Sequence, residues 1–104
     1  MEWKQLEVFS ETSNLAIVRM PGRNFPGCVI QGDSLSNLLN DVQKILLHAE
    51  VSGDAELIAL TKDVFRAISG RLDHYEAVLH EHGIPLPYVR KLSAPGDDGS
   101  VTQN

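Results

Sequence analysis

The sequence is poor in cysteine and lacks long apolar runs. Cys28 is the only thiol, so an internal disulfide framework is excluded. No apolar run approaches the ~20 residues that a transmembrane helix needs. The first residues, Met1-Glu2-Trp3-Lys4, lack the apolar segment of a signal peptide. These absences predict a protein of the reducing cytoplasm with no membrane span.

Basic residues are also scarce. Nine Lys and Arg stand against fourteen Asp and Glu, which gives a net charge of −5. Binding to nucleic acid needs a basic face, so we expect no nucleic-acid partner. An acidic surface would instead steer a basic protein partner. The hydrophobic share of 42% over 104 residues is enough for one modest core and therefore for one domain.

The N-terminal third has the pattern of short strands separated by turns. Apolar segments at about residues 6–10, 15–20 and 28–31 are bounded by polar, Pro-rich and Gly-rich stretches. We therefore predict a small antiparallel sheet of about three strands. Asp33 or Ser34 is the expected N-cap of the helix that follows.

Two helices are predicted from apolar residues at helical spacing, with a break at Ser52-Gly53-Asp54 where Ser52 or Asp54 can cap the second helix. The first stripe is Leu35, Leu38, Leu39, Val42, Ile45, Leu46 and Ala49. The second is Leu57, Leu60, Val64, Phe65, Ile68, Leu72, Tyr75, Val78, Leu79 and His82. The second helix, from about 55 to 82, ends before Gly83 and two prolines.

The predicted fold is α+β, with the order βββαα and the small sheet packed on an antiparallel helical hairpin. Residues 1–90 form the domain, and residues 91–104 have the composition of a disordered tail. A helix of about 28 residues is ~40 Å long, whereas a five-residue strand spans only ~17 Å. The second helix therefore bends at Ser69-Gly70, or its C-terminal half packs on something other than the sheet.

Residue types that could carry chemistry are present without the spacing that chemistry needs. Asp73, Glu76 and His80 share one helical face, but one helix cannot surround a metal ion, and no His-Glu-x-x-His motif occurs. Cys28 lies in an apolar segment, where a thiol behaves as a small hydrophobic side chain. We expect no metal, no cofactor and no catalytic residue.

One segment resembles a known family. The string Pro26-Gly27-Cys28-x-x-Gln31-Gly32-Asp33-Ser34-Leu35 is similar to the signature of the HicB-like antitoxins, which joins the third strand to the first helix of a small domain. The resemblance covers about residues 15–47. It implies a protein that binds and neutralises a small basic toxin.

A second resemblance covers the whole chain. Pro21-Gly22-Arg23-x-Phe25-Pro26-Gly27, together with Tyr75-Glu76-x-x-Leu79-x-x-His82-Gly83, looks like a small bacterial family of unknown function. This resemblance implies a bacterial cytosolic protein and no particular activity.

Two hypotheses for the function follow. The first is a non-enzymatic protein-binding module, antitoxin-like or immunity-like, that neutralises a basic partner protein as a monomer or as a homodimer. Its expected binding residues are Arg23, Phe25, Tyr75, Glu76 and His80. The alternative is a ligand-binding protein or small enzyme with a pocket between sheet and hairpin, near Arg23, Asp33 and Tyr88.

Overall fold

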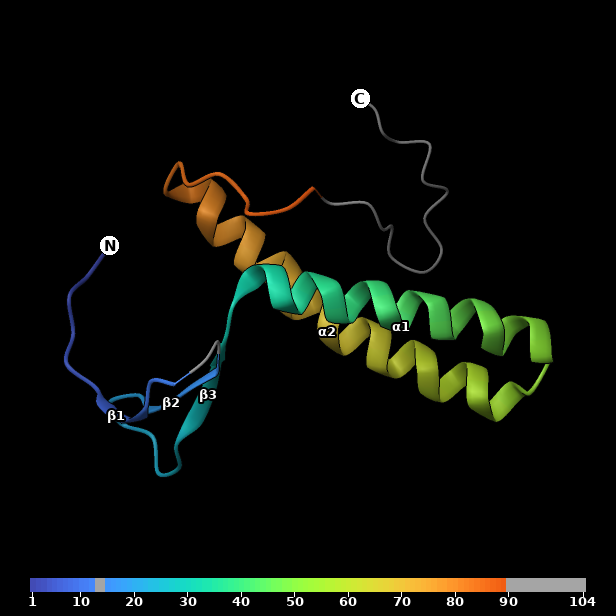
Figure 1. Cartoon of the computed structure of the whole chain (residues 1–104), viewed down its shortest axis with the longest axis horizontal. Coiled ribbons are helices and arrows are strands. Elements are labelled where there is room, and N and C mark those ends of the chain that lie inside the picture. The colour runs from blue at the N-terminus through green and yellow to red at the C-terminus, as the bar shows by residue number, and fades with distance from the viewer. Residues whose placement is uncertain (13–14, 90–104) are drawn as a thin grey trace.

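The structure is a computed structural model that describes residues 1–12 and 15–89. Three strands precede two helices: β1 (Glu7–Ser10), β2 (Leu15–Arg19), β3 (Gly27–Ile30), α1 (Gly32–Ser52) and α2 (Ala55–Glu81). This arrangement confirms the predicted α+β class, the βββαα order and the long second helix (Figure 1). The tail predicted for residues 91–104 lies outside the described residues.

The sheet is an antiparallel meander with β2 in the centre. Leu15 pairs with Ile30 and Val18 with Gly27 across the β2–β3 ladder. The β1–β2 ladder pairs Glu7 with Arg19 and then shifts register between Val8 and Ser10. Such a bulge bends and twists a strand, so β1 forms an irregular edge while β3 forms a regular one.

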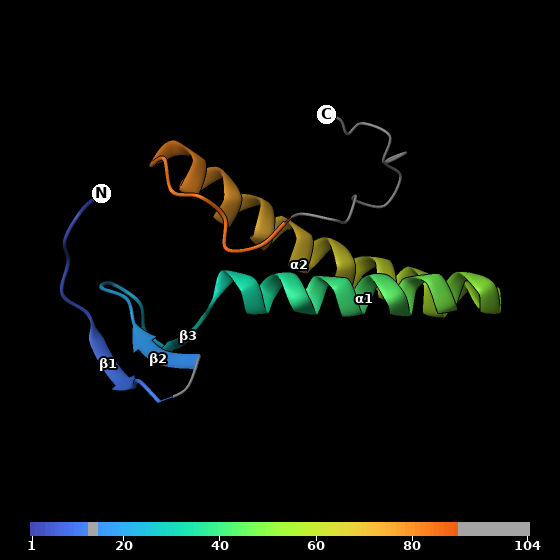
Figure 2. The same ribbon diagram turned by 45° about the horizontal axis from the view of Figure 1, so that its top comes forward.

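The core lies between the two antiparallel helices. Leu39 of α1 meets Phe65 and Leu72 of α2, and all three side chains are almost completely buried. Partly buried side chains surround this cluster, namely Leu35, Val42, Ile68, Tyr75 and Tyr88. Figure 2 shows α1 and α2 lying side by side along most of α1.

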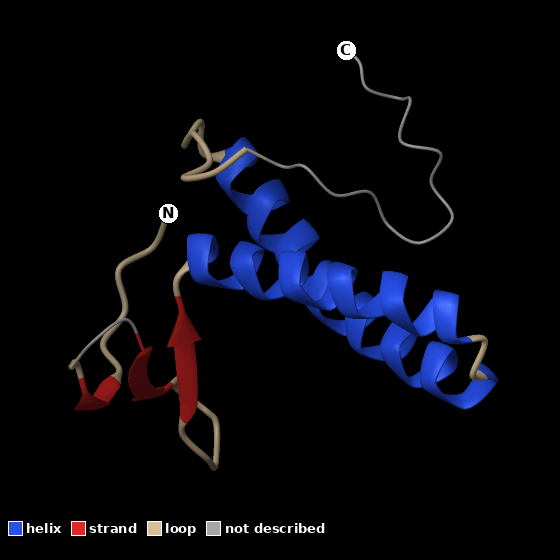
Figure 3. Ribbon diagram, turned by 45° about the vertical axis from the view of Figure 1, so that its right-hand side comes forward, coloured by secondary structure: helices blue, strands red, loops and turns tan. Residues whose placement is uncertain are grey.

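The sheet stands beside the end of the hairpin where α1 begins, rather than beneath it (Figure 3). Extensive contacts join β1 to β2, β2 to β3 and α1 to α2, but no described strand makes such a contact with a helix. Val18 is the only buried hydrophobic side chain in the described strands. The most deeply buried sides of α1 and α2 face each other, and the sheet lies beyond the end of this packed seam. The sequence predicted that the sheet packs on the hairpin. In the structure the sheet instead lies beside one end of the hairpin, and its described strands make no extensive contact with a helix.

The two helices begin in different ways. α1 begins at Gly32, earlier than predicted, and Gln31 holds the cap position without a side-chain hydrogen bond. The Asp33 carboxylate instead accepts from the Ser34 N–H at 2.8 Å, inside the first turn, where its charge suits the helix dipole. The expected capping by Asp33 or Ser34 is therefore wrong. Asp54 does cap α2, accepting from two backbone N–H groups at 3.1 Å each.

The C-terminal half of α2 is covered by the chain that follows it. Gly83 adopts a φ of 67°, and the Ile84 N–H donates to the Leu79 carbonyl at 2.9 Å. This left-handed turn sends the chain back, and Tyr88 packs against the core cluster. α2 is one continuous helix through Ser69 and Gly70. Within residues 1–12 and 15–89, no helix is both long and apolar enough to span a bilayer.

Gly70 offers a direct test of the local environment of α2. No atom lies within 4 Å of the place where its Cβ would be, and its φ is not positive. We expect Gly70→Ala to stabilise the protein by about 0.5–1 kcal/mol, because alanine loses less backbone entropy in a helix interior. Urea unfolding followed by circular dichroism measures this change. A loss of stability would show that α2 needs a glycine at this position.

Candidate functional site

Tyr75 joins the N-terminal glycine motif to the long helix. Its side chain is half-buried, and its ring lies directly over the backbone of Gly32. A Cβ at position 32 would lie 2.2 Å from Tyr75 Cζ, far inside van der Waals contact. The glycine of the Gln31-Gly32-Asp33 motif thus lets α2 approach the start of α1. This contact gives Tyr75 a packing role in addition to the binding role expected of it.

Glu76 and His80 lie one turn apart on the same part of α2. The Tyr88 hydroxyl donates to Glu76 Oε2 at 2.7 Å, and this bond holds the returning segment against the helix. His80 is exposed. An open cavity of about 390 Å³ is lined by Glu76, His80, Ile84, Pro85 and Leu86. The structure therefore places Tyr75, Glu76 and His80 together at the C-terminal end of α2.

Arg23 and Phe25 lie elsewhere, in the loop between β2 and β3. The Arg23 N–H donates to the Met20 carbonyl at 3.1 Å and closes a turn there. Phe25 is 81% exposed, so its ring has almost no cover. The five predicted binding residues therefore form two groups, one on the sheet and one on α2.

The alternative pocket would need Arg23, Asp33 and Tyr88 around one cavity. Arg23 instead lines a cavity on the sheet, Asp33 bonds the Ser34 N–H, and Tyr88 bonds Glu76. Each of the three residues has its own local environment. The structure does not gather them into one site.

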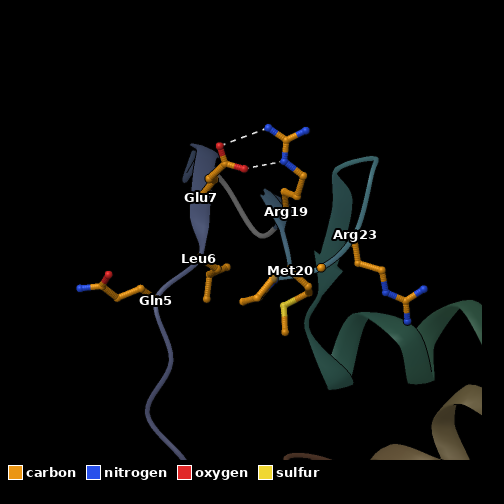
Figure 4. A pocket seen from close by; sticks show the side chains of 8 residues that line it. Gln5, Leu6, Glu7, Arg19, Met20 and Arg23 are labelled. Atoms are coloured by element: carbon orange, nitrogen blue, oxygen red, sulfur yellow. Dashed lines mark hydrogen bonds and ion pairs between the residues drawn. The ribbon is translucent and has the colours of Figure 1, made fainter.

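The sheet cavity has a volume of about 350 Å³ and is formed by β1, β2 and the turn after β2. Figure 4 shows Glu7 and Arg19 facing each other across its rim. Arg19 donates to both Glu7 carboxylate oxygens, from Nη2 at 3.1 Å and also from Nε. Its guanidinium also lies 5.6 Å from the centre of the Phe9 ring. These contacts join β1 to β2 and pair the charges of Glu7 and Arg19 with each other.

Sequence reasoning missed the pair of Glu7 and Arg19. Hydrogen bonds from Arg19 and its positive charge lower the pKa of Glu7, and the same contacts raise the pKa of Arg19. The two residues face each other because they are partners in the ladder. Their opposite charges were the one signal of this pair in the sequence. That signal identifies the pair only when the register between β1 and β2 is known.

Apolar side chains remain uncovered over the sheet. Their exposed fractions run from 42% for Ile30 to 81% for Phe25. We call this set the sheet surface, and it comprises Phe9, Leu15, Met20, Phe25, Val29 and Ile30. Val29 and Ile30 are successive residues of β3, so the exposed side chains lie on both faces of the sheet. Cys28 is also exposed, because β3 is an edge strand with no cover. The expected role of Cys28 as a packed hydrophobic side chain is therefore not what the structure shows.

Side chains that could ligate a metal are spread over the molecule. Among residues 1–12 and 15–89, no cluster of three or more His, Cys, Asp or Glu side chains is arranged to hold an ion. Asp73, Glu76 and His80 share one face of α2. The Glu76 carboxylate in this set accepts a hydrogen bond from the Tyr88 hydroxyl.

Gly32→Ala tests the contact between the glycine motif and α2. We expect a loss of about 1–3 kcal/mol in the free energy of unfolding, since a methyl group would displace the packed Tyr75 ring. Urea unfolding measures the loss. Gly27→Ala is the matched control, because nothing lies within 4 Å of the place that its added methyl group would take in β3. Equal stability of the two variants would contradict the close approach.

The pair of Glu7 and Arg19 predicts a dependence on pH. The pKa of Glu7 in the folded protein lies below its ordinary value. The pair therefore stabilises the folded sheet at pH values above that ordinary pKa. This contribution is lost as pH falls through the depressed pKa. An NMR titration of the Glu7 carboxyl carbon should show the low midpoint in the wild type and an ordinary midpoint in Arg19→Gln. A wild-type midpoint at the ordinary value would show that the pair is not formed in solution.

The comparisons with known proteins give a family and no activity. A family model described as "Family of unknown function (DUF6959)" matches residues 1–88. No curated protein and no solved structure matches the chain. The family match spans both groups of predicted binding residues, the sheet and the complete hairpin. The chain therefore belongs to DUF6959, a family whose function is unknown.

Proposed function

We propose that the chain is a non-enzymatic protein-binding module of the antitoxin or immunity type, which occludes a basic partner protein in the bacterial cytoplasm. The observation that carries this proposal is the uncovered sheet surface. The partial resemblance of the Pro26–Leu35 segment to the HicB-like antitoxins is in line with it.

A small sheet with no cover is an unusual structure for a protein in water. Three strands of four or five residues need a buried apolar face, or a helix packed on them, to be stable. Here the side chains of Phe25, Val29 and Ile30 remain exposed, and the described strands make no extensive contact with a helix. Exposed apolar surface of this kind is typical of a protein interface. A partner seated on the sheet would supply the missing cover.

The charge distribution supports a basic partner. Positions 32–81, which make up the hairpin, hold nine acidic and four basic residues, so they carry a net charge of −5. Positions 1–31 hold three acidic and three basic residues and are neutral. The neutral sheet surface can therefore supply contact area, while the acidic hairpin beside it steers a basic protein toward it.

The proposal is tested by capturing the partner on matched variants. We would tag the chain at its C-terminus, express it in its own host and identify the proteins that co-purify. A basic protein at stoichiometric amount is expected with the wild type. Phe25→Ser should lose it, because Phe25 is exposed and its loss removes contact area without unfolding the monomer. Val51→Ser is the control, since Val51 is comparably uncovered at 88% but lies at the far end of α1.

The captured protein is then purified and its affinity measured at low and high salt. Binding should weaken as salt rises, because screening removes the attraction of the acidic hairpin for a basic surface. An acidic partner, or equal capture by Phe25→Ser and Val51→Ser, would count against the proposal.

A further inference from the structure

The hairpin has one apolar face that the core does not use. Val42 and Ile45 of α1 and Leu60, Thr61 and Val64 of α2 line an open groove of about 170 Å³ along the two helices. Leu38 and Leu57 continue this face, because each lies seven residues, or two helical turns, from a groove residue. We call this set the hairpin face.

The hairpin face is a continuous, half-exposed apolar patch. Leu38, Ile45, Leu57, Leu60 and Val64 are between 42% and 57% exposed. Together they present on the order of 400 Å² of apolar surface, which is the size of the largest patch on many proteins, and such a patch is often a binding site. The radius of gyration, 16.5 Å, also exceeds the ~13 Å expected of a compact chain of about 100 residues. The molecule is elongated and leaves this face open along its length.

We propose that the hairpin face binds the same face of a second copy of this chain, and that the two hairpins form a four-helix bundle. This inference is independent of the proposed function, which uses the sheet surface. No residue of the hairpin face is charged, whereas the hairpin as a whole carries the net charge of −5. Asp41 lies within a helical turn of Leu38 and Ile45, so it stands beside the face. The apolar side chains of the face itself are complementary to those of a second copy.

The area agrees with a stable dimer. About 65% of a homodimer interface is apolar, so on the order of 400 Å² of apolar surface corresponds to roughly 600 Å² buried on each copy. The total, roughly 1,200 Å², reaches the lower limit of specific interfaces. Two-fold symmetry would place each helix of one hairpin beside a helix of the other, as in known four-helix bundles.

Two neighbouring residues of α1 provide a matched test. Ile45 lies in the groove and is 52% exposed, whereas Leu47 is 53% exposed and points about 200° away around the helix axis. Ile45→Glu and Leu47→Glu therefore make nearly the same chemical change on opposite faces. Because both side chains are half exposed in the monomer, neither change should unfold it, and circular dichroism checks this.

Analytical ultracentrifugation of the purified full chain measures the result. We expect the wild type and Leu47→Glu to sediment as dimers of the 11.5 kDa chain. Ile45→Glu should weaken the dimer by at least ~100-fold, since the two-fold axis places two unpaired carboxylates in the interface. Leu60→Glu, on the other helix of the same face, should do the same. A monomeric wild type, or a dimer that survives both Ile45→Glu and Leu60→Glu, would overturn the inference.

The dependence of affinity on salt concentration distinguishes this dimer from the complex with a basic partner. Two copies that each carry a net charge of −5 repel one another, so the dimer should tighten as salt screens the repulsion. The complex proposed for the sheet surface should weaken under the same change. Loss of the dimer in Ile45→Glu with retained capture of the basic protein would leave the proposed function intact.

Discussion

The burial of Leu39, Phe65 and Leu72 between α1 and α2 is the interaction on which the rest of this structure depends. Fully burying each such side chain contributes on the order of 1.5–3 kcal/mol, and the described residues contain no other cluster of comparable burial. The sheet is linked to this core through Gln31 and the contact of Tyr75 with Gly32. The returning segment is tied to it by Tyr88. One helical seam thus supports two appendages, neither of which has a core of its own.

The elements themselves were predictable, because their signals are local. Apolar residues at helical spacing between Leu35 and Ala49 placed α1, and the break at Gly53 and the cap at Asp54 separated it from α2. The start of α1 was not predictable from residue preference. The Asp33 carboxylate accepts a hydrogen bond from the Ser34 N–H, and Gln31 takes the cap position without a side-chain hydrogen bond. Nor could the stripe show that Leu39 is buried while Leu38 is half exposed. One partner helix covers only part of an apolar stripe. How much of the stripe is covered depends on the tertiary packing of the two helices, which the stripe itself does not encode.

The candidate site was predictable only in part, for a similar reason. The motif of Gly32 and the helix position of Tyr75 were both visible in the sequence, but only the fold shows the ring against the glycine. Glu7 and Arg19 meet because of a ladder register that no local pattern specifies. The division of charge is different: a count along the chain separates a neutral strand region from an acidic hairpin. This division, together with the uncovered apolar side chains, gives the molecule two surfaces of different character.

The connections between elements have a consequence for how the chain folds. Only Gly53 and Asp54 separate α1 from α2, and each element makes its extensive contacts with the element next to it in sequence. Closing such short loops costs little chain entropy, and proteins dominated by local contacts fold on fast timescales. The hairpin can therefore form without waiting for the strands. The described strands make their extensive contacts with one another and none with a helix, so the sheet can pair independently of the hairpin.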